Sequence, residues 1–534
     1  MRKILLAIVL VSLFAGAKCL GRYEPLANED KAGLYVRSIE RVLRLEADEV
    51  DLATAVLIIS EQWNDNVMGR RYVSVIDDMA YEIRERLKAG RLRANHRAIP
   101  VINKYLFDDL GFKSVKEASN PRDLFLHSVL DNKRGYCLSL SVLYLSLAER
   151  LGLPLYGVVV PGHFFVRYDN GRVRFNIETT SGGGGAADEH YINKFKVPED
   201  NDGIYMRNLD KMQTLGCFFN NLGNSYTDVG NIEQALVALE RAVEINPSLA
   251  ECRTNLGNIY LKKDRIEDAI KQYRAALQIN PAGAKTHNNL GNAYTKAGRL
   301  DDAISEYSES LELDPDFAEV YTNLSVVYCE KKMFATAESV LKEAIALEPR
   351  NGGFYINLGN VYNQSGQCEK AILQYNRALK LASDTAEVHY GMGLCYNKLG
   401  MVNDEIRAYK KALSIKPDMI AALANLGNAY FAKADYDAAI EQYKKAVRVK
   451  SDDAAIHYNL GAAHSNKGDY EAAVAEYLRA VELEPEMADA HNGLAFVYYK
   501  LKEYELAWKY IKIAEQLGAD ITEELTAAIE DKLH

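Results

Sequence analysis

The chain has 534 residues, of which 48% are hydrophobic and 26% are charged, a composition that is ordinary for a soluble globular protein of about three domains. Residues 1–215 hold 30 Lys and Arg against 28 Asp and Glu, so residues 216–534 hold 34 against 46. Because an acidic surface repels phosphate backbones, this second part of the chain argues against a nucleic-acid partner.

Residues 1–17 have the pattern of an export signal. A basic pair precedes an apolar run over residues 4–14, and the small residues 15–17 supply a cleavage site. The run is too short to span a bilayer comfortably as a helix. Lys18 before Cys19 argues against a lipid anchor, since a small residue is needed there. We therefore expect a mature chain without a membrane span, in a bacterial periplasm or outside the cell.

Residues 28–131 are predicted to form a packed helical part. Apolar residues recur at spacings of three and four in the segments 51–63, 73–87 and 99–112, which is the period of an amphipathic helix. Asn120-Pro121 is typical of a cap followed by a proline in the first turn, and it predicts one more helix that continues through the sequence DLFLHSVLDNK.

Residues 132–210 are predicted to be an α+β core. A helix is expected to begin at Cys137 in GYCLSLSVLYLSLAERLGLP, and three β-rich runs follow it: LYGVVV, HFFVRY and RVRFNIE. Asp169-Asn170-Gly171 joins the last two runs as a hairpin. This order places Cys137 at a helix start, His163 at the start of a strand and Glu178 at the end of the next strand.

Those three residue types in that order suit a cysteine nucleophile. A thiol attacks as the thiolate, which a helix N-terminus and a neighbouring imidazolium both favour. His163 would then take and return the proton, Glu178 would fix the imidazole tautomer, and the amide of Cys137 would donate to an oxyanion. A structural role for all three, as a buried Cys, a strand His and a solvated Glu, is the alternative.

The block NPRDLFLHSVLDNKRGYCLSLSVLYLSLAERLGLP, together with NKYLFDDLGF before it and PGHFFVRYD after it, resembles the SirB-type branch of the transglutaminase-like superfamily. The resemblance covers roughly residues 45–210. It implies a papain-like fold with catalytic Cys137, His163 and Glu178. Glu178 stands where the superfamily usually has Asp. Many members of this branch lack the Cys, so membership does not itself imply catalysis.

Residues 216–521 repeat every 34 positions, which is the signature of a solenoid built from pairs of helices. A Pro usually ends each unit, where it stops the second helix. The small residue of each unit stands at Gly223, Gly257, Gly291, Ser325, Gly359, Gly393, Gly427, Gly461 and Ala495. The array resembles the tetratricopeptide repeat family, with nine units, and residues 522–534 are predicted to be the helix that caps its end.

An Asn recurs two positions before the small residue in seven units, at Asn221, Asn255, Asn289, Asn323, Asn357, Asn425 and Asn459. An amide both donates and accepts, so such a ladder could pair with the backbone of an extended peptide in a concave groove. The pattern resembles the asparagine ladder of O-linked N-acetylglucosamine transferase. Hydrogen bonding within the array itself is the alternative.

Two further features of the repeats carry expectations. Five cysteines stand at different positions of the frame and are expected to be buried and unpaired: Cys217, Cys252, Cys329, Cys368 and Cys395. Glu405 takes a place that is Ala in the other eight units. A buried unpaired carboxylate is costly, so we expect either that Glu405 swings to solvent or that this unit is a soft joint.

The sequence therefore predicts an α-dominated, multidomain protein: a helical plus α+β transglutaminase-like domain followed by an all-α solenoid. The predicted function is exported protein binding combined with thiol chemistry on an amide, as hydrolysis or as acyl transfer. A silent domain within an envelope scaffold, and an amidase acting on cell-wall peptides, are the alternatives. No cofactor and no metal site are implied, and the oligomeric state is open.

Overall fold

The computed structural model describes residues 38–63, 66–115, 121–197, 205–519 and 521–533. The predicted export signal at residues 1–17 lies outside the described residues. The chain divides into two compact units, Met1–Ala293 and Tyr294–His534. The mixed part of the fold lies in the first unit, and the second unit consists of helices. The predicted fold class is confirmed.

The N-terminal helices of the first unit pack into one core. They are α1 (Ile39–Val42), α2 (Leu52–Trp63), α3 (Gly69–Ala89), η2 (His96–Ala98), α4 (Ile99–Asn103), the π-helical turn η3 (Lys104–Asp109), η4 (Pro121–Asp123) and α5 (Leu126–Asn132). The single helix predicted after Pro121 was wrong, because the buried Phe125 has an extended backbone between η4 and α5.

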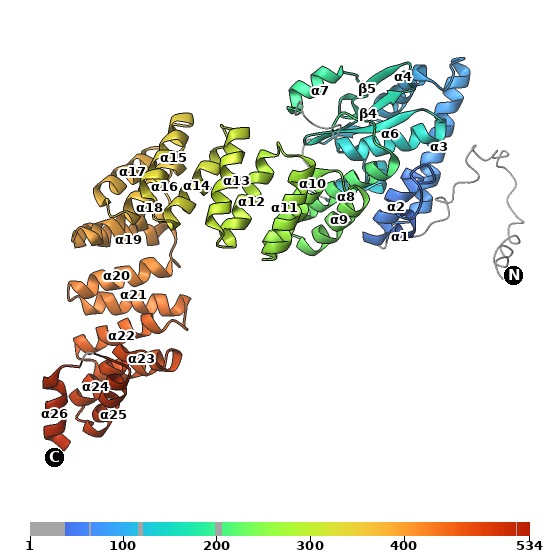
Figure 1. Cartoon of the computed structure of the whole chain (residues 1–534). Helices are drawn as coiled ribbons and strands as arrows, with labels where there is room; N and C mark the ends of the chain where they lie inside the picture. Colours follow the sequence, from blue (N-terminus) through green and yellow to red (C-terminus); the bar gives the residue numbers. More distant parts are fainter. Residues whose placement is uncertain (1–37, 64–65, 116–120, 198–204, 520, 534) are drawn as a thin grey trace, which may run out of the picture. The chain divides into compact units, whose positions relative to one another are not determined.

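The α+β core has the predicted order of elements. Helix α6 (Cys137–Leu151) packs on an antiparallel sheet of order β3-β4-β5, made by β3 (Leu155–Val160), β4 (His163–Asp169) and β5 (Arg174–Ile177) (Figure 1). A short parallel pair, β1 (Lys113–Ser114) and β2 (Arg134–Gly135), and the helices η5 (Thr179–Ser181) and α7 (Asp188–Phe195) complete this part. The helix at Cys137 and the three strands confirm the prediction.

The register of the hairpin fixes where the candidate residues stand. His163 pairs with Val160 at the start of β4, and Val166 pairs with Ile177 near the end of β5. Glu178 therefore follows the last paired residue of β5, on the strand next to the one that carries His163. The predicted turn at residues 169–171 is present within a loop that the pair Asp169 and Arg174 closes, and Gly171 has a positive φ of 78°, which glycine adopts without strain.

Pairs of antiparallel helices follow in both units. The first unit holds α8 (Lys211–Asp228), α9 (Ile232–Ile245), α10 (Ala250–Lys262) and α11 (Ile266–Ile279), and α12 (Ala284–Lys296) runs across the boundary between the units. In the second unit the helices are α13 (Leu300–Leu313), α14 (Ala318–Glu330), α15 (Phe334–Leu347), α16 (Gly352–Gln364), α17 (Cys368–Lys380), α18 (Ala386–Lys398), α19 (Val402–Ile415), α20 (Ile420–Ala432), α21 (Tyr436–Val449), α22 (Ala454–Lys467), α23 (Tyr470–Leu483), α24 (Ala488–Lys500), α25 (Tyr504–Gln516) and α26 (Glu523–Leu533).

The recurring glycine has a direct packing reason. A Cβ built on Gly427 would lie 2.5 Å from Cε1 of the buried Tyr443, sixteen residues later on the partner helix, and the same close approach recurs in the units of Gly257, Gly359 and Gly393. Where the frame carries Ser325 or Ala495, the residue sixteen positions later is Leu341 or Ile511. In the units that carry a tyrosine sixteen residues later, the glycine thus makes room for its ring, whereas Gly223 lies against Leu239.

The tyrosine of this pair also explains why an Asn directly follows the glycine in several units. The hydroxyls of Tyr273, Tyr375 and Tyr443 donate to the side-chain oxygens of Asn258, Asn360 and Asn428, at 2.7, 2.8 and 2.6 Å. A buried hydroxyl without a partner is costly, and the amide that follows the glycine provides one.

Glu405 is buried, so the alternative in which its side chain turns to solvent was wrong. Its side chain accepts a hydrogen bond of 3.0 Å from Nδ2 of Asn397, and the residue is 2% exposed. Burial raises the pKa of Glu405, and the bond from Asn397 only partly offsets this. A carboxyl group with a raised pKa therefore occupies a position that Ala fills in the other units. Whether the unit is a soft joint stays a prediction.

The described cysteines are unpaired, and Cys217, Cys252, Cys329, Cys368 and Cys395 are buried as expected. Among the described residues, no helix is both long and apolar enough to cross a bilayer.

Candidate active site

Cys137 is the first residue of α6 and is half-buried. The turn before it is held closely. Ser139 Oγ accepts from the amide of Tyr136 at 2.8 Å, and a Cβ on Gly135 would lie only 2.6 Å from that same oxygen. The Cys137 amide is in the first turn of the helix, beyond the reach of any carbonyl of the same helix, and is therefore available to another acceptor.

His163 and Glu178 form a direct pair. Nε2 of His163 lies 2.7 Å from Oε2 of Glu178, and the two side chains are 13% and 15% exposed. The additional methylene of Glu, relative to the Asp that the resemblance implies, therefore does not prevent the contact. Since Nε2 is engaged by the carboxylate, Nδ1 is the ring nitrogen that remains for the Cys137 thiol.

Neighbours hold both members of the pair. The second oxygen of Glu178 accepts from the amide and the hydroxyl of Thr180, at 3.1 and 2.5 Å. The imidazole of His163 stacks on the ring of Phe195 with 4.7 Å between the centroids and an angle of 5°. Sequence reasoning missed Thr180 and Phe195. Thr180 lies only two positions after Glu178, whereas nothing in the spacing of α7 indicated that Phe195 faces the imidazole.

The electrostatics favour a charged pair. Burial alone would lower the pKa of His163, but hydrogen bonds and charge from Cys137 and Glu178 outweigh it and raise the pKa to about 9. For Glu178, burial raises the pKa, yet the bonds from His163 and Thr180 bring it below its ordinary value. At neutral pH the imidazole is therefore protonated and the carboxylate is ionised.

The backbone around Glu178 is fixed by the glycine run that follows it. The amide of Glu178 donates to Gly184 O at 2.7 Å, and the amide of Gly183 donates to Glu178 O at 2.9 Å. Asn103 Nδ2 then binds Gly183 O at 2.9 Å, and Tyr144 donates to the oxygen of Asn103. The carboxylate thus stands on a turn that is tied to the helical part of the domain.

Cys137 and His163 line one pocket of about 160 Å³. Another part of its wall comes from the first two helix pairs, through residues of α8 and α10 that include Asn220, Asn224 and Glu251. Sequence reasoning did not predict this wall, because nothing in the 34-residue period indicates which unit faces the preceding domain.

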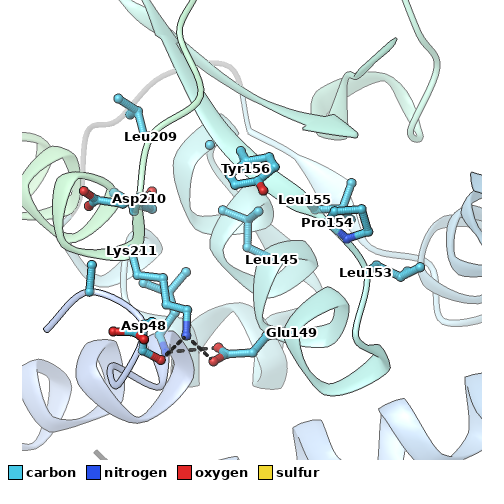
Figure 2. Close-up of a pocket in the computed structure, with 14 residues that line it drawn as sticks. Asp48, Leu145, Glu149, Leu153, Pro154, Leu155, Tyr156, Leu209, Asp210 and Lys211 are labelled. Carbon is cyan, nitrogen blue, oxygen red and sulfur yellow. Dashed lines mark hydrogen bonds and ion pairs between the residues drawn. The ribbon is translucent and has the colours of Figure 1, made fainter. Parts of the chain in front are cut away.

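A larger cavity of about 370 Å³ lies elsewhere in the first unit and contains none of the three candidate residues. Five of its fourteen lining residues are leucines, of which Leu145 belongs to α6, and Figure 2 shows Lys211 extending toward Asp48 and Glu149. The Lys211 ammonium lies 2.5 Å from Glu149 Oε1 and 2.6 Å from the carbonyl oxygen of Val50. These bonds connect the start of the first repeat helix to the domain before it.

The seven predicted ladder residues all lie in the first helix of a pair and are half-buried. Several of their amide nitrogens are engaged by the preceding unit: Asn255 Nδ2 donates to Asn220 Oδ1, Asn289 to Asn258 Oδ1, Asn357 to Thr322 Oγ1 and Asn425 to the Tyr390 hydroxyl, at 2.9 to 3.3 Å. Asn221 Nδ2 instead donates to Cys217 O in its own helix. The amide nitrogens therefore take part in the packing of the array.

Within the described ranges, no group of three or more His, Cys, Asp or Glu side chains is arranged to hold a metal ion.

Three family models match the chain. A model of the transglutaminase-like superfamily matches residues 70–196, and a tetratricopeptide repeat model matches residues 427–468 and 465–502. The model of the C-terminal domain of cilia and flagella-associated protein 70 matches residues 218–416. The chain thus contains a transglutaminase-like domain, and tetratricopeptide repeats follow it. This is the combination that the sequence predicted.

Among curated relatives, a UPF0162 protein of Xylella fastidiosa is 32% identical over 120 residues, which are 22% of this chain and 41% of that protein. F-box only protein 21 of Mus musculus is 38% identical over 76 residues, 14% of this chain and 12% of that protein. The chain thus spans less than half the length of the relatives that it matches.

Solved structures that resemble the chain include a tetratricopeptide repeat protein from Parabacteroides merdae, with a TM-score of 0.40, 17% identity, and coverage of 46% of this chain and 98% of that one. PilF of Pseudomonas aeruginosa has a TM-score of 0.36, 20% identity, and coverage of 42% and 99%.

Proposed function

We propose that the protein uses Cys137 as a nucleophile on an amide bond of a polypeptide, with His163 as the acid and base and Glu178 as the group that orients the imidazole. The contact of 2.7 Å between His163 Nε2 and Glu178 Oε2, in a pocket that Cys137 also lines, carries this proposal. Tetratricopeptide repeats imply protein partners, which suits a polypeptide substrate.

The steps follow from the arrangement of the three residues. The Cys137 thiolate adds to the amide carbonyl carbon, and the developing oxyanion accepts a hydrogen bond from the Cys137 amide. His163 gives its proton to the leaving nitrogen, the C–N bond breaks, and a thioester remains on the enzyme. Water or an amine then adds to the thioester, His163 takes a proton from it, and the thiolate leaves. Water makes the reaction hydrolysis, and an amine makes it acyl transfer.

The repeats would hold the polypeptide near the thiol. Because five of the ladder amides donate inside the array, we propose that a bound peptide meets mainly their side-chain oxygens, which accept hydrogen bonds from backbone N–H groups. Alanine at Asn357 and Asn425 together should then weaken binding of a partner protein. Unchanged affinity, measured by calorimetry on a folded variant, would leave the ladder with a packing role alone.

We also propose that the mature chain is exported and acts in a bacterial periplasm or outside the cell. The apolar run and small residues within residues 1–17 support this. N-terminal sequencing of the protein, after expression of the whole sequence with residues 1–17 included, tests this proposal. The expected first residue is Lys18. A chain that retains its first 17 residues in the cytoplasm would contradict export.

The thiol chemistry is tested by the rate at which iodoacetamide alkylates Cys137 in the full chain as a function of pH. Peptide mapping separates Cys137 from the buried cysteines. Fast labelling well below pH 8 is expected of a thiol that a neighbouring imidazolium activates. His163→Ala should abolish it, while His190→Ala, a change at an exposed histidine of α7, should not.

Slow labelling of Cys137 that does not depend on His163 would contradict the proposal. The protein would then be better described as a non-catalytic scaffold whose repeats bind partners.

A further inference from the structure

Glu251 lies on the repeat side of the pocket that contains Cys137 and His163. It belongs to the first turn of α10 and lines the same pocket as Cys137. The residue is therefore part of the second repeat and of the candidate active site at once.

One oxygen of this carboxyl group has no partner. Oε1 of Glu251 accepts a hydrogen bond from the Tyr205 hydroxyl, whereas Oε2 is buried and, among the described residues, makes no hydrogen bond. Within the same residues Glu251 belongs to no ion pair. Burial raises its pKa, and its own backbone hydrogen bond only partly opposes this.

The same frame position in other units shows that this burial is particular to the pocket. Glu319 and Glu387 stand six residues before the small residue of their units, as Glu251 does, and both are exposed. An acidic residue in the first turn of a helix is favourable there because of the positive end of the helix dipole. Only at Glu251 does the preceding domain cover the side chain, through Tyr205.

A buried carboxyl group with an unsatisfied oxygen is costly unless a partner compensates it. A cationic group entering the pocket would form an ion pair with the carboxylate, so that neither charge stays uncompensated. The pocket of about 160 Å³ has room for one side chain.

We propose that Glu251 selects the substrate by binding a cationic side chain, the ammonium of a lysine or the guanidinium of an arginine, next to the bond that Cys137 attacks. This inference rests on the proposed role of Cys137, because it makes the repeat wall a part of the same site. Glu251 is a specificity-determining residue in this view, and Cys137 remains the group that reacts.

The charge selectivity of Cys137 labelling tests the inference. The probes are three methanethiosulfonates of similar size that carry an aminoethyl, an ethyl or a sulfonatoethyl group. Each transfers its thioalkyl group to the Cys137 sulfur as a disulfide and releases methanesulfinate. The rate with each probe on the full chain is divided by its rate with a free thiol in solution, and peptide mapping confirms the labelled residue.

The aminoethyl probe is expected to react with the wild-type protein about tenfold faster than the ethyl probe, which corresponds to about 1.4 kcal/mol for one charge pair. Glu251→Gln keeps the shape of the side chain and should remove the preference, while Glu251→Asp should retain part of it. Glu387→Gln, at the exposed equivalent position, should leave the preference unchanged and so exclude a general effect of the acidic array.

Equal normalised rates for the aminoethyl and ethyl probes in the wild type, or a preference that survives Glu251→Gln, would overturn the inference. Thermal unfolding of each variant verifies that it is folded. The outcome differs from a failure of the proposed function: fast, His163-dependent labelling without charge preference refutes only the role of Glu251. Slow labelling of Cys137 that does not change in His163→Ala refutes the catalytic proposal. The charge preference among the three probes can still be measured in that case.

Discussion

Replacing Glu178 by Gln tests the pair that this residue forms with His163. The substitution keeps the size of the side chain and removes the charge that lies 2.7 Å from His163 Nε2. A pKa of about 9 instead of 6.5 favours the protonated ring by about 3 kcal/mol, since one pH unit is worth about 1.4 kcal/mol. Cys137 and Glu178 share this free energy. We therefore expect Gln to remove about half of it and to lower the pKa of His163 by about one pH unit.

The pair also makes stability depend on pH. Because folding raises the pKa of His163, its stabilisation is fully present below pH 6.5 and is lost as the pH rises through about 9. The free energy of unfolding of the wild type should thus fall by up to about 3 kcal/mol across this window, and that of Glu178→Gln by about half as much.

Two measurements check these values. Titration of the Hε1 resonance of His163, assigned with the His163→Ala variant, gives the pKa in each protein. Urea unfolding at several pH values across the window gives the free energies. An unchanged titration midpoint in Glu178→Gln would refute the reasoning, because the carboxylate would then contribute nothing to the charge of the imidazole. Glu189→Gln, on the exposed surface of α7, is the matched control.

Three further predictions concern stability. Lys211→Met should lower the free energy of unfolding by about 2 kcal/mol, because it removes the ammonium that lies 2.5 Å from Glu149 Oε1. Urea unfolding of Lys211→Met measures this loss, and a double variant in which Glu149 is also Met is the comparison. The free energy of unfolding of the wild type should fall as the pH rises from about 4.3 through the raised pKa of Glu405, and Glu405→Gln should remove this fall. Parallel pH profiles for the two proteins would contradict this. Gly427→Ala should cost about 1–3 kcal/mol, since its Cβ would lie 2.5 Å from Tyr443 Cε1, and the cost should shrink in a Tyr443→Leu background. Equal costs in both backgrounds would exclude the ring as the cause.

Local and periodic features of the sequence predicted much of the fold. The start of α6 at Cys137, the three strands and the turn at residues 169–171 follow from patterns that span a few neighbouring residues. The helix pairs follow from the 34-residue period. The prediction failed where one buried residue overrode the local pattern, as Phe125 does by dividing the helix expected after Pro121.

The sequence by itself determined the order of Cys137, His163 and Glu178 on helix and strands, because that order depends on the spacing of residues along the chain. Only the tertiary structure decided that a Glu reaches the imidazole, and that α8 and α10 supply part of the wall of the pocket. Glu251 and Glu387 occupy equivalent positions of the repeat, yet one is covered and the other is exposed. The side chain is buried by a domain that is distant in sequence, and a repeating pattern does not indicate which unit contacts that domain.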